Sequence, residues 1–376
     1  MINRRDFIRK SAIGTGAIIA GTQMSCSRAP KVPSYLAGYE ELYKNSPRAA
    51  AVKYFEEAKF GLFMHYGLYS LLQGEWNGVV SRPAEWVQLR SLVPVAEYAK
   101  LADQFTAEKF DADFITDMVL AAGMKYVNIT TRHHDSFCLF DSKYTDFKST
   151  NTPTKRDLVG ELAEQCQQKG IGLYLYYSHG RDWKHPHAPN VDEWGRNARP
   201  AYVLAEPTYK TGDEHDLGIY VEFMKNQITE LLTNYGPVGA IWLDGISHLL
   251  KFPEKVPQFK LQELYDHIHS LQPQVLVSYK QGVLGTEDFK APERHWQGGP
   301  TVVPLELCDT LQPKSWGHAT YDEGNHKTAD DVMKMLEHAE ELNANLLLNT
   351  GPLPDGSIHP DDVKTLREVG RRLKDA

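Results

Sequence analysis

Residues 171–178 read IGLYLYYS, a short apolar run that is typical of a β-strand covered on both faces of a sheet. Apolar side chains then repeat at three- and four-residue spacing from Leu217 to Tyr235, which predicts a helix that ends at Gly236. A second apolar run, AIWL, follows at 240–243. Strand, helix and strand in this order predict two parallel strands joined by a crossover helix.

Short apolar runs of the same kind recur along most of the chain. They lie at 60–65, 125–130, 275–279 and 345–349. Between the runs, helices are predicted at 157–168 and after Thr328, whose hydroxyl is a suitable N-cap. Six or seven strands over roughly 300 residues predict an α/β fold of the (β/α)8 or TIM-like type, in which some strands are irregular. No dinucleotide or phosphate-binding motif favours a doubly wound fold instead.

The composition is that of a soluble globular protein. Hydrophobic residues make up 41% and charged residues 24% of the 376, so the chain can bury a large core without a disulfide or a metal to hold it together. The formal net charge is -8 and no long basic run is present, so we predict no nucleic-acid partner.

The first 25 residues are predicted to be an export signal rather than part of the fold. Arg4 and Arg5 lie in a charged segment before an apolar run at 11–21, which is too short to span a bilayer. The paired arginines resemble a bacterial twin-arginine signal, which directs the export of folded proteins. The predicted organisation is an export signal at 1–25, a linker and first helix at 26–50, and a catalytic barrel at 51–376.

Cys26 follows soon after the apolar part of this signal. Its position resembles a lipoprotein attachment site, and cleavage nearby by an ordinary signal peptidase is the alternative. We therefore expect an exported protein, located in the periplasm or at the cell surface. Membrane contact is expected only through a lipid anchor at Cys26.

Polar and ring-bearing side chains stand at the ends of the predicted strands. They are His65, His133, His134, Tyr177, His179, Asp244 and Lys280. In (β/α)8 barrels the active site forms at the carboxyl ends of the strands, so we expect these side chains to converge on one pocket.

A pair of carboxylates is the chemistry that these strand ends indicate. Asp244 ends the apolar run at 240–243, where it could serve as a nucleophile, a metal ligand or a helix cap. A second carboxylate is expected from the loop at 285–294, in which Glu287 and Glu293 are the candidates. Two carboxyl groups on either side of a bond are the equipment for glycoside hydrolysis, and the alternative is a surface cluster of ion pairs.

Six motifs along the chain resemble those of one enzyme family. In order they are FGLFMHYGLYS at 60–70, HHDSF at 133–137, KRDLVGE at 155–161, WLDG at 242–245, SWG at 315–317 and NLLLNTGP at 345–352. Together they resemble family 29 of the glycoside hydrolases, the retaining α-L-fucosidases. The matches run in order over about residues 55–372. The chain departs from the usual pattern at Tyr66 (often Trp), Ser136 (often Gly) and Lys280 (often Arg).

The resemblance implies a role for each matching position. Asp244 matches the nucleophile and Glu293 the acid/base, with Glu287 as a competitor because that segment varies within the family. The positions implied to bind substrate are His65, Glu85, His133, His134, Tyr177, Trp242, Lys280 and Trp316. The implied substrate is a fucosylated oligosaccharide or glycoconjugate, and no cofactor is implied. The chain ends soon after the last motif, so we expect no C-terminal β-sandwich, a domain that many members carry.

Three other functions fit parts of the sequence. No His pair has a zinc spacing, and adjacent histidines such as His133 and His134 point to opposite faces of a strand, so no metal is expected. A non-catalytic carbohydrate-binding protein would not need Asp244 and an acid partner. An α-L-galactosidase or related exo-glycosidase would differ in the wall beside the methyl group of the sugar, for which Phe63, Trp76 and Trp316 are candidates.

Overall fold

The computed structural model describes residues 31–246, 249–280, 282–294 and 301–375. The predicted export signal at 1–25 and the predicted lipidation site at Cys26 lie outside these residues. Residues 32–376 form one compact unit, in which α1 (Glu40–Asn45) and α2 (Pro47–Ala58) precede the first strand.

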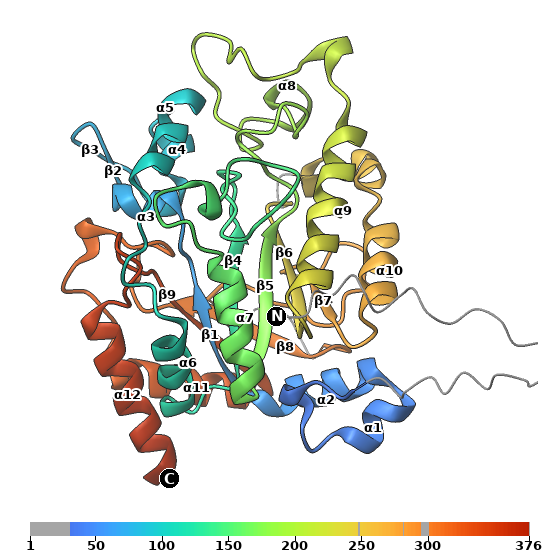
Figure 1. Ribbon diagram of the computed structural model, residues 1–376, viewed down its shortest axis with the longest axis vertical. Coiled ribbons are helices and arrows are strands. Elements are labelled where there is room, and N and C mark those ends of the chain that lie inside the picture. Colours follow the sequence, from blue (N-terminus) through green and yellow to red (C-terminus); the bar gives the residue numbers. More distant parts are fainter. Residues whose placement is uncertain (1–30, 247–248, 281, 295–300, 376) are drawn as a thin grey trace, which may run out of the picture. The chain divides into compact units, whose positions relative to one another are not determined.

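Seven parallel strands form the central sheet, and six of them are the apolar runs identified in the sequence (Figure 1). In chain order they are β1 (Phe60–Met64), β4 (Tyr126–Arg132), β5 (Gly172–Ser178), β6 (Ala240–Asp244), β7 (Leu276–Ser278), β8 (Leu305–Thr310) and β9 (Ala344–Thr350). Across the sheet the order is β7-β6-β5-β4-β1-β9-β8. Every neighbouring pair is parallel, as strands joined by crossover helices should be.

The segment 288–294 closes the sheet into a barrel between its two outer strands. It is bridged to β7 through Phe289 and to β8 through Lys290 and Glu293, in parallel in each case. Backbone hydrogen bonds from Asp288 to Val277 and from Ala291 to Lys280 support the pairing with β7. The predicted (β/α)8-type barrel is confirmed, with this segment as an irregular eighth strand.

The helices lie outside the sheet and cover its strands (Figure 1). They are α6 (Ala112–Ala121), α7 (Leu158–Lys169), α9 (Leu217–Asn234), α10 (Leu261–Leu271), α11 (Ala329–Glu341) and α12 (Pro360–Asp375). Thr328 caps α11 in a capping box with Asp331, which confirms the predicted start of this helix. Short elements occupy the loops after the strands: α3 (Leu68–Leu72), β2 (Glu75–Trp76), β3 (Val79–Val80), α4 (Val87–Arg90), α5 (Val95–Ala99) and α8 (Val191–Trp194).

The inside of the barrel is aromatic and is covered at its amino-terminal end by α2. Phe55 of α2 packs against Phe289 with ring centroids 4.3 Å apart, and it also contacts Tyr126 and Tyr174 on the strands. A second, larger apolar cluster lies between the strands and the outer helices. Because α2 packs at the amino-terminal end, the carboxyl ends of the strands are the side on which the barrel can admit a ligand.

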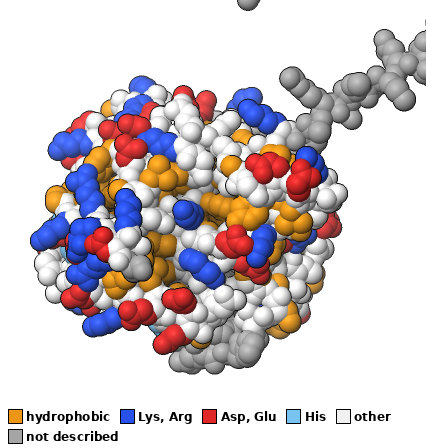
Figure 2. Space-filling view, turned by 90° about the horizontal axis from the view of Figure 1, so that it is seen from below, with side chains coloured by type: hydrophobic (Ala, Val, Ile, Leu, Met, Phe, Trp, Pro, Cys, Tyr) orange, Lys and Arg blue, Asp and Glu red, His pale blue; other side chains and the backbone are white. Residues whose placement is uncertain are grey.

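Charges of both signs share the surface below the barrel. Figure 2 views the molecule from below Figure 1, the side on which α12 lies, and acidic and basic side chains intermingle there with apolar ones. Ion pairs such as Arg372 with Asp330 and Arg371 with Glu368 neutralise part of this charge. In the described part of the chain, no helix combines the length and the apolar character needed to cross a membrane.

Candidate active site

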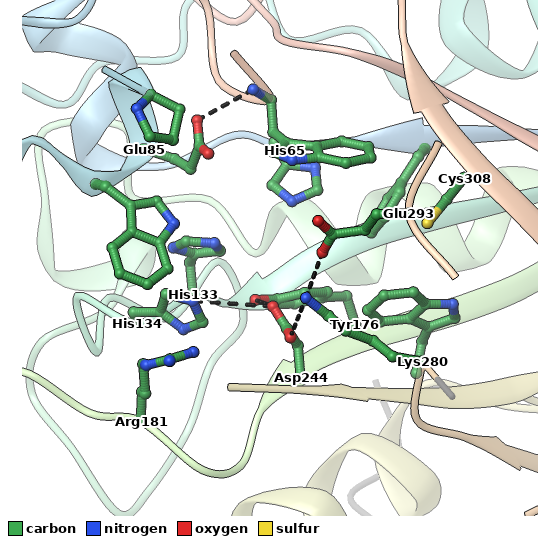
Figure 3. Close-up of a pocket in the computed structure, with 15 residues that line it drawn as sticks. His65, Glu85, His133, His134, Tyr176, Arg181, Asp244, Lys280, Glu293 and Cys308 are labelled. Carbon is green, nitrogen blue, oxygen red and sulfur yellow. Dashed lines mark hydrogen bonds and ion pairs between the residues drawn. The ribbon is translucent and has the colours of Figure 1, made fainter. Parts of the chain in front are cut away.

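A cavity of about 280 Å³ opens where the strands of the barrel end (Figure 3). Its lining residues are Phe63, His65, Pro83, Glu85, Trp86, His133, His134, Tyr176, Arg181, Trp242, Asp244, Lys280, Glu293, Cys308 and Trp316. All of the predicted site residues line it except Tyr177 and the alternative acid Glu287. The expected convergence of the strand ends on one pocket is therefore what the fold produces.

Asp244 is the last residue of β6 and is only 8% exposed. Its Oδ2 accepts a hydrogen bond of 2.7 Å from the Tyr176 hydroxyl, and its Oδ1 lies 3.1 Å from the Lys280 ammonium. Burial alone would raise the pKa of this carboxyl, but Lys280 and the Tyr176 hydrogen bond hold the pKa of Asp244 well below its usual range. Asp244 is therefore a carboxylate, which is the form that a nucleophile requires.

Gly245 allows the chain to turn directly after this carboxylate. Its φ is +90°, and a Cβ at this position would meet the Arg181 backbone nitrogen at 3.0 Å. The His179 ring donates through Nδ1 to the Asp244 carbonyl at 2.7 Å, and the His179 backbone amide donates to the same oxygen at 2.9 Å. The loop after β5 thus fixes the backbone of Asp244.

Lys280 lies between the two carboxylates of the site (Figure 3). It follows β7, and its Nζ contacts both Asp244 Oδ1 and Glu293 Oε1. Glu293 lies on the irregular eighth strand with its side chain 41% exposed, so solvent and a leaving group can reach its carboxyl. The predicted carboxylate pair is thus brought together around one ammonium.

Glu287, the competing acid, has a structural role instead. Its carboxylate accepts backbone hydrogen bonds from Val283, Leu284 and Gly285, and a further one from the Tyr265 hydroxyl. These bonds hold the turn at 283–285 and leave the side chain outside the cavity. Of the two candidates, the geometry brings Glu293 to the site.

Two imidazoles are oriented to accept hydrogen bonds from a bound hydroxyl. Asn349 donates to the Trp316 carbonyl, which turns its Oδ1 toward His65 to accept from Nδ1 at 2.8 Å. Ser178 donates to the Arg181 carbonyl, so its oxygen accepts from His134 Nδ1 at 2.6 Å. Burial lowers the pKa of His65 to about 4 and that of His134 well below its usual value. Both rings are neutral, with Nε2 left as an acceptor.

His133 and His134 both line the cavity, which corrects the expectation that they point to opposite faces. That expectation assumed a strand, but β4 ends at Arg132 and both histidines lie in the turn that follows. Ligand atoms of His133, His134 and Asp244 lie within 4.8 Å of one another, close enough to hold a metal ion. The Lys280 ammonium already supplies positive charge at Asp244, and a divalent cation there would be repelled by it.

Tyr176, not Tyr177, is the tyrosine of the site. Adjacent residues of a strand point to opposite faces, and the sequence prediction selected the wrong one of the two. The Tyr176 ring stacks on Trp242 inside the barrel and its hydroxyl contacts Asp244. Tyr177 faces outward, where its hydroxyl donates to Gln227 at 2.8 Å beneath the Arg132 guanidinium.

Glu85 connects the cavity to the loop that carries Trp316. Its Oε2 accepts backbone hydrogen bonds from Trp316 and Gly317 and one from the Ser315 hydroxyl. Its Oε1 is buried and has no partner within the described residues. Burial raises the pKa of Glu85 to about 7. The unpaired oxygen is placed to accept a hydrogen bond from a ligand hydroxyl.

A second buried carboxyl supports the inner wall of the cavity. Glu306 on β8 accepts hydrogen bonds from the Trp242 indole at 3.0 Å and from the Tyr126 hydroxyl at 2.7 Å. Burial raises the pKa of Glu306 to about 7. These two bonds fix the Trp242 ring, which packs against Phe63 at a centroid distance of 5.4 Å.

Several lining residues escaped the sequence analysis. They are Pro83, Trp86, Tyr176, Arg181 and Cys308. Arg181 lies 5.0 Å over the Trp86 ring, and both come from loops, where the strand pattern gives no signal. Cys308 could have been found only by identifying β8. Of the candidate walls for a sugar methyl group, Phe63 and Trp316 line the cavity and Trp76 does not.

The fold and the site together define a class of enzyme. Two carboxylates, three imidazoles and several aromatic rings converge at the open end of a (β/α)8 barrel. Imidazoles and carboxylates can hydrogen-bond the hydroxyls of a sugar, and paired carboxyl groups cleave glycosidic bonds. These are the features of a glycoside hydrolase.

The family follows from comparison with known proteins. The family model described as Alpha-L-fucosidase matches residues 29–376, and the chain belongs to this family. Tissue alpha-L-fucosidase of Rattus norvegicus is 28% identical over 345 residues, which cover 86% of this chain and 68% of the relative. A putative alpha-L-fucosidase of Caenorhabditis elegans is 27% identical over 337 residues, which cover 85% of this chain and 64% of the relative.

Solved structures of bacterial fucosidases share the fold. Alpha-L-fucosidase AlfC from Lactobacillus casei, in complex with its α-L-fucose product, has a TM-score of 0.74 at 31% identity, covering 86% of this chain and 98% of that one. Alpha-L-fucosidase isoenzyme 1 from Paenibacillus thiaminolyticus has a TM-score of 0.72 at 32% identity, covering 88% of this chain and 76% of that one.

The two adjacent tyrosines provide a matched test of the site. Tyr176→Phe removes a hydrogen bond to the Asp244 carboxylate, and losing a bond to a charged group costs about 1.5–3 kcal/mol. We expect kcat/KM for 4-nitrophenyl-α-L-fucopyranoside to fall roughly 10- to 100-fold. Tyr177→Phe should change it less than roughly threefold, because Tyr177 faces away from the cavity. Equal losses in the two variants would contradict this assignment.

Proposed function

We propose that this chain is a retaining α-L-fucosidase that removes terminal α-L-fucosyl groups from glycans through a covalent glycosyl-enzyme intermediate. The observation that carries the proposal is the contact of the Asp244 and Glu293 carboxylates with one Lys280 ammonium at the wall of the cavity. In support, AlfC has been crystallised in complex with Fuca(1,6)GlcNAc and, as a second complex, with 4-nitrophenyl-a-L-fucopyranoside.

The spacing of the carboxylates favours retention of configuration. Because both touch the same nitrogen atom, their nearest oxygens lie no farther apart than two hydrogen-bonding contacts, roughly 6 Å. Retaining enzymes hold their carboxyl groups about 5–5.5 Å apart, whereas inverting enzymes need about 6.5–9.5 Å to fit a water molecule. The shared ammonium therefore supports direct attack by Asp244.

In the first step, Asp244 attacks the anomeric carbon and the bond to the leaving oxygen breaks. Glu293 gives its proton to that oxygen, so the aglycone departs as an alcohol. The neutral Nε2 atoms of His65 and His134 accept hydrogen bonds from sugar hydroxyls and orient the ring. The product of this step is an ester between Asp244 and the sugar.

In the second step, water breaks this ester. Glu293 is now a carboxylate, and it takes a proton from a water molecule that attacks the anomeric carbon from the side the aglycone left. Fucose is released with its original configuration, and Asp244 returns to the carboxylate form. Glu293 is protonated again and ready for the next substrate.

The apolar part of the wall favours a 6-deoxy sugar over its hydroxylated counterpart. Phe63, Trp242 and Trp316 pack together on one side of the cavity, with Trp316 and Phe63 centroids 6.0 Å apart. A methyl group is stabilised against such rings, whereas a hydroxymethyl group would lose its hydrogen bonds with water there. α-L-Fucosides are therefore expected to be better substrates than α-L-galactosides.

Azide identifies the two catalytic carboxylates, because small anions react in the space left by a shortened side chain. With 4-nitrophenyl-α-L-fucopyranoside, Asp244→Ala should lose at least about 10³-fold in kcat, and azide should restore turnover to give the β-fucosyl azide. Glu293→Ala should still release nitrophenol, which leaves without an acid, and should give the α-fucosyl azide. The product configuration is read by NMR.

Glu287→Ala is the matched control for the acid. It should hydrolyse a natural fucosyl oligosaccharide at a rate near that of the wild type and form no fucosyl azide. An α-fucosyl azide from Glu287→Ala, with none from Glu293→Ala, would move the acid/base role to Glu287. An Asp244→Ala variant with full activity would overturn the mechanism.

Export through the twin-arginine route is also proposed, on the basis of the signal at 1–25. Arg4→Lys with Arg5→Lys should keep the enzyme in the cytoplasm, because this route depends on the paired arginines. Fucosidase activity in fractions of the native host measures this directly. Cys26→Ala should release the enzyme from the membrane fraction if the lipid anchor is present, and an unchanged distribution would favour ordinary cleavage of the signal.

A further inference from the structure

A second group of imidazoles and a carboxylate lies apart from the cavity, where two loops at the same end of the barrel meet. Glu323 and His326 belong to the loop between β8 and α11, and His359 directly precedes α12. Ligand atoms of these three residues lie within 4.8 Å of one another. Neither the proposed mechanism nor the motifs give this group a role.

The distances are close to those of a metal site. Glu323 Oε2 lies 3.2 Å from His359 Nε2 and 3.9 Å from His326 Nε2. Zinc at about 2.0–2.1 Å from each of its ligands would place tetrahedral ligand atoms roughly 3.3 Å apart. The two imidazole rings are stacked with centroids 4.2 Å apart, so small rotations of the side chains bring their Nε2 atoms onto one ion.

His326 is already held in the form in which it can bind a metal. Its Nδ1 lies 2.6 Å from Asp362 Oδ1, and the other oxygen of Asp362 accepts from the Thr350 hydroxyl. Because Nδ1 donates its proton to Asp362, neutral His326 presents an unprotonated Nε2 to Glu323. A carboxylate that orients a histidine in this way is the usual support of a metal-binding imidazole.

We propose that Glu323, His326 and His359 bind one divalent transition-metal ion of the zinc type. Two imidazoles and a carboxylate are ligands that Zn²⁺ accepts, with water in the fourth position. Glu323 is 41% exposed, which gives the ion a path from solvent. His318 Nε2 lies 3.4 Å from Glu323 Oε1 and orients this carboxylate from its other oxygen.

Metal binding at this place displaces a proton. The Asp361 backbone amide donates to His359 Nδ1 at 3.2 Å, so the Nε2 of His359 carries the hydrogen that points to Glu323. The metal takes the place of this hydrogen, and Asp361 Oδ2, 4.0 Å from Nδ1, is near enough to accept the proton after a rotation. Zinc affinity should therefore fall as the pH is lowered.

The consequence is a crosslink between two loops of the catalytic face. The loop that contains Glu323 and His326 also contains Ser315 and Trp316, which Glu85 holds at the cavity. His359 belongs to the chain between β9 and α12. An ion bound to both loops would stabilise the wall of the cavity without touching the substrate.

The test is zinc titration of the untagged, chelator-treated protein. Calorimetry should show one Zn²⁺ per chain, and saturating zinc should raise Tm on the order of 5 °C. Co²⁺ should give the visible absorption of a tetrahedral site. His326→Ala, His359→Ala and Glu323→Gln should each weaken binding at least about tenfold, and Asp362→Asn about 10- to 100-fold.

Two controls separate this site from other histidines. His187→Asn alters a histidine of another loop and should leave the zinc affinity unchanged. L-Fucose, which is proposed to fill the cavity, should not compete with zinc. The proposal is overturned if zinc does not bind, if the His326→Ala/His359→Ala double variant binds it as tightly as the wild type, or if L-fucose displaces it, which would place the ion at His133, His134 and Asp244.

Discussion

One buried ammonium, that of Lys280, lies against both carboxylates of the site. Taking Asp244 out of water is costly for its charge, and a carboxyl in this position would be protonated without a nearby cation. Lys280 offsets that cost and keeps Asp244 ionised. The surrounding imidazoles are kept neutral by burial, so they add hydrogen bonds without adding charge. The site thus holds its charge in one compact group.

The barrel topology explains why these three charged groups meet. Asp244 ends β6 and Lys280 follows its neighbour β7, while Glu293 lies on the irregular strand that closes the barrel beside β7. Parallel strands place their carboxyl ends on the same side, so residues far apart in sequence come into contact. Lys280 has a φ of +26°, a backbone conformation that a residue other than glycine adopts at some cost in energy, and such positions are common at active sites.

The sequence predicted most of this fold because most strands are short apolar runs between punctuated helices. It missed β8, where Glu306 and Asp309 interrupt the apolar pattern, and the closing strand at 288–294, which contains Pro292. Strand ends located the cavity, but a pattern of types cannot tell which of two adjacent tyrosines faces inward. Glu293 and Glu287 could be separated only by their contacts, since both are acids in one loop.

The most direct test of this account is the pH dependence of kcat/KM for Lys280→Gln. In the wild type, Asp244 has a pKa well below its usual range, so it stays ionised and active in mildly acidic buffer. Without the ammonium, burial dominates and raises the pKa of Asp244, so the acidic limb of the profile should move to higher pH. Lys290→Gln, outside the cavity, should leave the limb in place. A Lys280→Gln variant with lower activity but an unshifted acidic limb would contradict the account.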